Sequence, residues 1–230
     1  MIPTFSIIIP AHNEENYIRK TLHSIKNQSY QNFETIIVAN GCTDKTEEIV
    51  KKRANENLKL ISLSTPNVSA ARNAGALNAI GEILLFLDAD TALEVDSLKK
   101  IKEQFSLKYS VATTKVKPDN HKIKYKIAMW FKNFYNSTKI YQGCGGALIC
   151  RKEDFHKVQG YDPEIIVKEH RILTIKLKKL GKYGCMDTTV TTSMRRFERW
   201  GLSKATLFWL KEWTKAWIGD LSKSKYEKIR

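Results

Sequence analysis

The feature that most constrains the fold is a short apolar run that stops at two carboxylates. Residues 83–87 are all apolar, follow Gly81-Glu82 and precede Asp88-Ala89-Asp90. Such a run is too short to cross a membrane and is typical of a strand covered on both faces in a parallel α/β sheet. Ligands of these sheets bind beyond the carboxyl ends of the strands. The sequence therefore predicts that Asp88 and Asp90 lie at a ligand site.

The spacing of the two aspartates favours a metal. In extended backbone their side chains share one face, and small Ala89 leaves room for a turn. Two carboxylates there suit a hard divalent cation that also binds phosphate oxygens, such as Mg²⁺ or Mn²⁺. The alternative is that one aspartate caps a helix beginning at Thr91 and the other is solvated.

Composition narrows the class of protein. The 230 residues are 42% hydrophobic, which predicts one large domain or two tightly joined halves. With 39 Lys and Arg against 24 Asp and Glu, the net charge of +15 favours an anionic partner: nucleic acid, a phospholipid surface or a phosphorylated small molecule. The chain shows no membrane span, signal peptide or CxxC pair, so a cytoplasmic protein with reduced cysteines and no zinc site is expected.

Two more predicted strands end in polar turns. Residues 5–9 end at Pro10, and Asn13 is expected to cap a helix over residues 14–27. Residues 34–39 end at a second turn. Because consecutive strands usually neighbour each other, His12, Asn13 and Glu14 are expected beside the aspartates. Asn40 is expected to be able to hydrogen-bond the edge of a nucleobase. A satisfied turn and cap is the alternative for His12 and Asn13.

A strand over residues 58–63 and a helix over residues 69–80 complete a parallel, doubly wound first half. Arg72 is expected in the first turn of that helix, where the helix N-terminus and the guanidinium both favour a phosphate. The alternative is an ordinary surface arginine.

Four motifs stand at these strand ends and this helix start: residues 10–15 (Pro-Ala-His-Asn-Glu-Glu), 40–44 (Asn-Gly-Cys-Thr-Asp), 71–75 (Ala-Arg-Asn-Ala-Gly) and Asp88-Ala89-Asp90. In this order and spacing they resemble the inverting glycosyltransferases of family 2, which have the GT-A fold. The resemblance implies a Rossmann-like α/β protein with a mostly parallel central sheet flanked by helices. It also implies Mg²⁺ or Mn²⁺ at Asp88 and Asp90.

The same resemblance implies a nucleotide-sugar donor. The residues expected to bind it are Pro10, His12, Asn13, Glu14, Asn40, Arg72 and Asp88, joined by Arg195 and Arg196, where paired arginines suit a diphosphate. The family often has Asp-Asp-Gly-Ser at the second turn, whereas this chain has Ala39-Asn40-Gly41-Cys42. Asn40 offers both a donor and an acceptor, so the base, in a UDP- or GDP-linked donor, stays open.

The second half is predicted from less regular signals. A strand over residues 111–116 precedes a helix over residues 121–135, whose aromatic face is expected to pack in the core. Glycines within residues 142–146 are expected to let a substrate approach the backbone. Two short strands are expected over residues 183–186 and 190–194.

The catalytic base is the main departure from the family pattern. The family has Glu-Asp on a helix, with the Asp as general base, whereas this chain has Glu169-His170. Histidine is a competent base near neutral pH, and Glu169 is the other candidate. A phosphate acceptor, already ionised, would need no base.

The expected organisation has three parts: residues 1–95 bind the donor, residues 96–200 bind the acceptor and residues 201–230 form a basic amphipathic helical tail. Its tryptophans, Trp209, Trp213 and Trp217, are four residues apart and favour an interfacial helix on anionic lipid at the inner membrane face. Docking on the catalytic domain or on a second subunit, as in a homodimer, is the alternative.

The function predicted is an inverting, metal-dependent glycosyltransferase that acts on a membrane-associated acceptor, such as a polyprenyl phosphate or a lipid-linked glycan. No nucleic-acid partner is expected. One alternative is a sugar-phosphate nucleotidyltransferase, but its usual glycine-rich loop is missing after the first strand. The other is a non-catalytic basic module that binds membrane or nucleic acid, for which an intact Asp88 and Asp90 would have no use.

Overall fold

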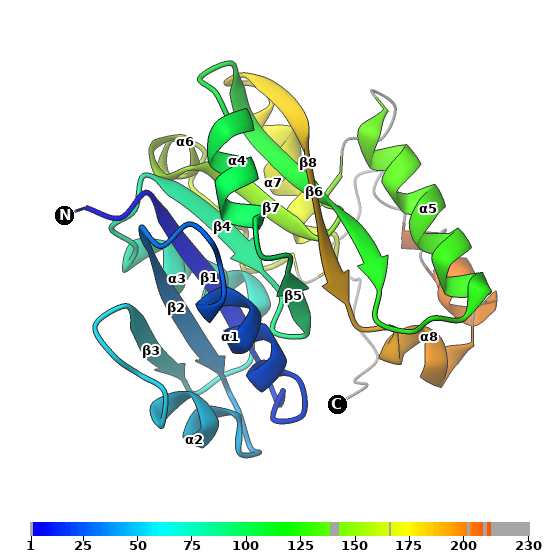
Figure 1. Ribbon diagram of the computed structural model, residues 1–230, viewed down its shortest axis with the longest axis horizontal. Helices are drawn as coiled ribbons and strands as arrows, with labels where there is room; N and C mark the ends of the chain where they lie inside the picture. The colour runs from blue at the N-terminus through cyan, green and yellow to red at the C-terminus, as the bar shows by residue number, and fades with distance from the viewer. Residues whose placement is uncertain (1, 139–142, 166, 202, 209–210, 213–230) are drawn as a thin grey trace.

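The computed structural model describes residues 2–138, 143–165, 167–201, 203–208 and 211–212. Within these ranges, eight strands form one sheet in the order β3-β2-β1-β4-β7-β6-β8-β5 (Figure 1). The strands are β1 (Phe5–Ala11), β2 (Phe33–Asn40), β3 (Leu58–Leu63), β4 (Ile83–Leu87), β5 (Thr91–Leu93), β6 (Tyr109–Pro118), β7 (Ala147–Arg151) and β8 (Lys182–Thr192).

Helices cover both faces of this sheet. They are α1 (Ile18–Lys26), α2 (Thr46–Lys51), α3 (Val68–Leu77), α4 (Ser97–Gln104), α5 (Ile123–Ser137), α6 (Lys152–Lys157), α7 (Glu169–Leu177) and α8 (Arg195–Trp200). One core cluster joins the sheet to α1, α2, α4 and α5, and the other joins it to α3, α6 and α7. Alternate residues of β4 enter the two clusters, which is why its sequence is apolar throughout.

The first half is parallel, as predicted. β1 pairs with β2 and β4, and β2 pairs with β3, all in parallel. The carboxyl ends of β1, β2 and β4 therefore meet at one edge of the sheet. The second half is mixed, because β7 runs antiparallel to both β4 and β6 while β6 and β8 are parallel.

In the first half, two local predictions and one alternative differ from the structure. Asn13 does not cap a helix: it has a left-handed backbone with φ of 53°, and α1 begins at Ile18. Thr91–Leu93 is strand β5, so no helix follows the aspartates for either of them to cap. Asp88-Ala89-Asp90 does not continue β4 as extended chain, because Thr91 N donates to the Asp88 carbonyl at 3.0 Å and closes a turn.

Two predictions in the second half are also wrong. The two short strands expected after residue 182 are one strand, β8, whose register against β6 shifts between Met186 and Thr189. The aromatic face of α5 does not lie in the core: Trp130, Phe131 and Phe134 are 61%, 53% and 56% exposed. The helix instead buries Tyr125 and Met129.

The described ranges include part of the predicted tail. Residues 203–208 and 211–212 are helical, whereas Trp209, Trp213 and Trp217 lie outside the described residues. No helix in the described ranges has the length and apolar content of a membrane span.

Candidate active site

Hydrogen bonds tie the turn after β1 to the turn after β2. The Nδ1 atom of His12 lies 2.7 Å from the carbonyl oxygen of Asn40. The side-chain oxygen of Asn13 accepts a 2.8 Å bond from the backbone N–H of Thr43. The side-chain oxygen of Asn40 accepts from Asn67 N at 2.8 Å. These bonds shape the turns, and Pro10 lies inside β1 opposite Val38.

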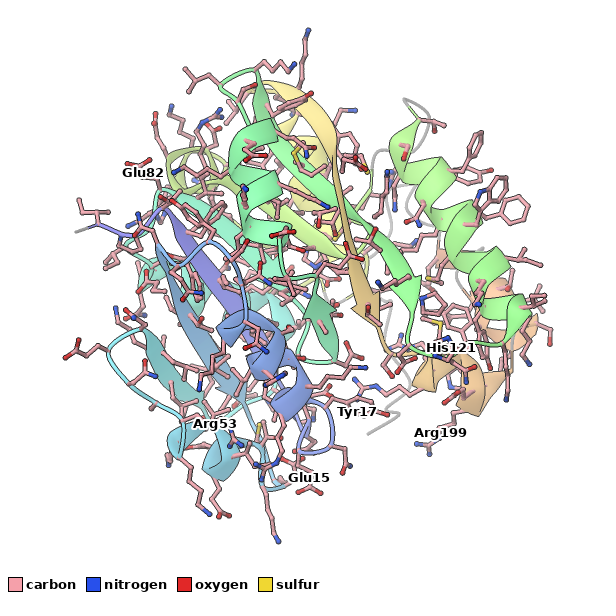
Figure 2. All side chains as sticks on the ribbon, viewed as in Figure 1. Glu15, Tyr17, Arg53, Glu82, His121 and Arg199 are labelled. Atoms are coloured by element: carbon pink, nitrogen blue, oxygen red, sulfur yellow. The ribbon has the colours of Figure 1, made fainter. Side chains whose placement is uncertain are left out.

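Glu14 and Asp90 converge on one guanidinium. Arg195, the first residue of α8, donates to the two carboxylate oxygens of Glu14 at 2.6 Å each, and its Nη2 atom lies 3.0 Å from Asp90 Oδ2. Its guanidinium also lies over the ring of Tyr17, 4.6 Å from the ring centre. Figure 2 shows Tyr17 projecting from the start of α1 toward α8. Burial acts to lower the pKa of Arg195, but the bonds to Glu14 and the charge of Asp90 raise it.

Arg72 holds the second carboxylate cluster. Its Nη1 donates to Glu169 Oε1 at 2.6 Å and its Nη2 to Asp88 Oδ1 at 2.9 Å. The arginine lies in the second turn of α3, not the first, and is fully enclosed rather than open to a phosphate. Burial acts to lower the pKa of Arg72, but the charges of Glu169 and Asp88 raise it, so it stays cationic. Arg72 thereby fixes the end of β4 against the start of α7.

Tyr161 links Arg72 to His170. Its ring lies under the guanidinium of Arg72 at 5.4 Å, and its hydroxyl is 2.8 Å from His170 Nδ1. Burial, together with the nearby charge of Arg72, holds the pKa of His170 well below its usual 6.5. The imidazole is therefore neutral at physiological pH.

A hydrogen bond from α1 anchors the turn that carries Asp88 and Asp90. The hydroxyl of Thr21 donates to the carbonyl oxygen of Ala89 at 2.7 Å. The turn leaves Asp88 half-exposed and Asp90 largely buried. The two carboxylates thus contact different arginines, one on α3 and one on α8.

Arg196 and the glycines differ from the sequence expectation. The guanidinium of Arg196 lies over the ring of Trp200 at 5.4 Å, within its own helix. A Cβ atom on Gly145 would clash with the Thr114 carbonyl, and one on Gly146 would clash with Val190. These glycines are required by close packing on β6 and β8, which the sequence did not reveal.

The structure therefore brings most predicted residues to one edge of the sheet: Glu14, Asp90 and Arg195 in one cluster, and Arg72, Asp88, Glu169 and His170 in the other. Sequence reasoning did not identify Tyr17 and Tyr161 as site residues. Tyr161 was detectable as the aromatic residue of the Gln159-Gly160-Tyr161-Asp162 turn, whereas no motif marks Tyr17.

The donor atoms available for a metal are carboxylate oxygens. No group of three or more His, Cys, Asp or Glu arranged to hold a metal occurs in the described ranges. Glu14 and Asp90 nevertheless converge on the positive charge of Arg195. Mg²⁺ typically takes one or two carboxylates and completes its shell with water and phosphate oxygens, and the residues present fit such an ion.

Known sequences similar to this chain include named glycosyltransferases. Glycosyltransferase GlyA of Streptococcus pneumoniae is 37% identical over 98 residues, which are 42% of this chain and 14% of GlyA. An uncharacterized glycosyltransferase of Haemophilus influenzae is 38% identical over 102 residues, 43% of this chain and 41% of the relative. The chain thus matches less than half the length of either relative.

A solved structure and a family model complete the comparison. The crystal structure of Staphylococcus aureus TarS residues 1–349 in complex with UDP superposes with a TM-score of 0.65 at 24% identity, covering 83% of this chain and 60% of that one. This likeness shows the GT-A fold. The model of glycosyl transferase family 2 matches residues 6–150, more than half of the chain. The protein therefore belongs to glycosyl transferase family 2.

Proposed function

We propose that the protein is an inverting, metal-dependent glycosyltransferase that moves a sugar from a UDP- or GDP-linked donor to a membrane-associated acceptor. The observation that carries the proposal is the pair of carboxylate clusters at the ends of β1 and β4, each organised by one arginine. Family membership supports sugar transfer as the reaction.

The donor would lie along the ends of β1, β2 and β4. At these strand ends His12, Asn13 and Asn40 would contact the nucleoside, and Asp88, joined by Arg195 from the start of α8, would contact the ribose and diphosphate. TarS has also been solved in complex with UDP-GlcNAc, at the same TM-score of 0.65 and 24% identity, which makes a UDP-linked sugar the first donor to test.

Asp90, with help from Asp88 and Glu14, would hold Mg²⁺ or Mn²⁺ on the diphosphate. A bound divalent ion neutralises negative charge on the leaving nucleoside diphosphate. Arg195 contributes a second positive charge beside Asp90. Arg72 has a different role. Its side chain is buried, and its hydrogen bonds position Asp88 and Glu169.

Glu169 would take the proton of a hydroxyl acceptor. The acceptor oxygen attacks the anomeric carbon opposite the leaving group, the bond from that carbon to the diphosphate breaks, and the proton passes to the carboxylate. His170 is the weaker candidate: if the Tyr161 hydroxyl donates to Nδ1, the neutral ring carries its proton on Nε2 and has no lone pair left for the acceptor.

The acceptor we propose is a polyprenyl phosphate or a lipid-linked glycan at the inner membrane face. The net charge of +15 supports an anionic surface as the place of reaction. Residues 1–95 would bind the donor and residues 96–200 the acceptor.

The test is calorimetric binding of UDP, GDP and their sugar conjugates, with and without Mn²⁺. We expect one nucleotide to bind only with metal, and Asp90→Asn to weaken it by about 10²-fold, which is the scale of two lost charge-assisted contacts. Glu153→Gln removes an exposed carboxylate on α6 and is the matched control.

Two results would contradict the proposal. Equal metal-dependent binding of the nucleotide by the wild type and by Asp90→Asn would show that Asp90 does not hold the metal. Salt-sensitive attraction without preference for any nucleotide would indicate a basic binding module instead.

A further inference from the structure

Helix α5 carries two apolar faces, and only one of them packs on the protein. The inward face buries Tyr125 and Met129 in the core cluster beside β6. The outward face is a stripe at spacings of four, three and four residues, and all of its members are exposed: Ile123, Ile127, Trp130 and Phe134. This spacing places the stripe along one side of a helix. Figure 1 shows α5 at the edge of the molecule, away from α1 to α4.

The outward face is a continuous aromatic surface. The rings of Trp130 and Phe134 stack with centres 6.0 Å apart, and Phe131 meets Trp130 edge-on at 5.0 Å. Tyr135, also exposed, extends the surface along the helix. Adjacent exposed rings of this kind mark an interaction site more often than isolated surface residues do.

The charge carried by α5 itself has one sign. Four exposed lysines belong to α5 or directly precede it: Lys122, Lys124, Lys126 and Lys132. The sequence from Asn120 to Lys152 contains no Asp or Glu. Lysines beside exposed tryptophan and phenylalanine are the composition of a helix that lies in the headgroup region of an anionic bilayer.

We propose that α5 is a membrane-docking face, with the stripe Ile123, Ile127, Trp130 and Phe134 inserted at the level of the headgroups of anionic phospholipid. Lys124 and Lys126, on either side of the stripe, contact the phosphates. The occupant is lipid rather than a second copy of the chain, because a twofold contact through α5 would set its lysines against one another with no carboxylate on either helix.

The test is sedimentation of the full chain with vesicles of phosphatidylcholine alone or mixed with phosphatidylglycerol. We expect binding only to the mixed vesicles, and the double variant Trp130→Glu/Phe134→Glu to weaken it by about tenfold or more. Leu107→Glu, at a loop residue 90% exposed, is the control for an added surface charge. Circular dichroism and thermal unfolding check that each variant folds.

Three results would overturn the docking face. Unchanged binding by the double variant would do so, and so would loss of binding only in Trp213→Glu/Trp217→Glu, which would assign docking to the tail. Concentration-dependent dimers that the double variant abolishes would assign the stripe to self-association. Nucleotide-sugar binding by the same double variant separates the two proposals, because α5 carries none of the donor residues.

Discussion

Arg72 shows what a single buried cation does for the site. It joins residues that are 16 and 97 positions away in the chain, Asp88 and Glu169. A buried ion pair adds little net stability over an apolar pair, but removing one partner leaves a buried charge and costs about 3–5 kcal/mol. The arrangement therefore serves geometry: the carboxylate after β4 and the one that opens α7 are held in a fixed relation.

At the same scale, the assignment of the base can be tested by two substitutions. With a hydroxyl acceptor and saturating donor, Glu169→Gln should lower kcat by about 10²-fold or more, since general bases contribute on that scale. His170→Gln should lower it by less than about tenfold. Donor binding should change little in either variant. The opposite order of effects in steady-state assays would make His170 the base.

The buried imidazole also makes a stability prediction. The pKa of His170 is lowered in the folded state, so the unfolded chain binds a proton that the folded chain does not. Its contribution to stability is present above pH 6.5 and is lost as the pH falls below 6.5 toward the folded pKa. The loss should approach about 1.4 kcal/mol per pH unit. Urea unfolding between neutral and mildly acidic pH should show a weaker pH dependence in His170→Gln. The prediction would be refuted if the free energy of unfolding changed equally with pH in the wild type and in His170→Gln.

At the scale of elements, strands were easier to predict than helix ends and faces. β4 was predicted at the bounds it has, because an apolar run between Gly81 and Asp88 allows few alternatives. The start of α1 was wrong because the left-handed backbone of Asn13 is fixed by Thr43, 30 residues away. The face of α5 was wrong because both of its stripes are apolar, and periodicity does not say which one meets the sheet.

The candidate site likewise contains residues that could be located from the sequence and a pairing that could not. The aspartates after β4 and the turn after β1 could be located from strand ends alone, since parallel strands bring their carboxyl ends together. The pairing of Glu14 with Arg195 spans 181 residues and depends on the path of β8, which local patterns do not encode.

The glycine segment before β7 gives a prediction at this scale. Gly146→Ala should destabilise the protein by about 1–3 kcal/mol, because its methyl group would clash with Val190 on β8. Adding Val190→Ala should recover part of that loss, giving a favourable coupling in a double-mutant cycle of urea unfolding. Val190→Ala should not restore the stability lost in Gly145→Ala, because the methyl group added there would clash with the backbone carbonyl of Thr114. Additive effects of Gly146→Ala and Val190→Ala would show that the contact is not limiting.

At the scale of the whole molecule, one sheet crosses the expected boundary between donor and acceptor halves. β5, within the first 95 residues, pairs with β8, and β4 pairs with β7. We therefore propose that residues 1–95 and residues 96–200 differ in the substrate they bind, donor or acceptor, but fold as one unit.

This continuity predicts a single unfolding transition. All five tryptophans follow residue 129, so their fluorescence reports the second half, while far-ultraviolet circular dichroism reports the whole chain. The two signals should coincide in urea, as expected of one cooperative unit. A fluorescence midpoint displaced from the dichroism midpoint would mean that the halves unfold separately.

The bond from Arg195 to Glu14 has a consequence for biosynthesis. A ribosome adding about 5–20 residues per second needs roughly 10–40 s to travel the 181 residues between them. In the later part of that interval Glu14 and Asp90 have been synthesised while Arg195 does not yet exist, and β5 lacks the strand it pairs with. Closure of the site thus has to wait for β8 and α8, and a nascent chain halted before β8 contains these carboxylates without the arginine that joins them.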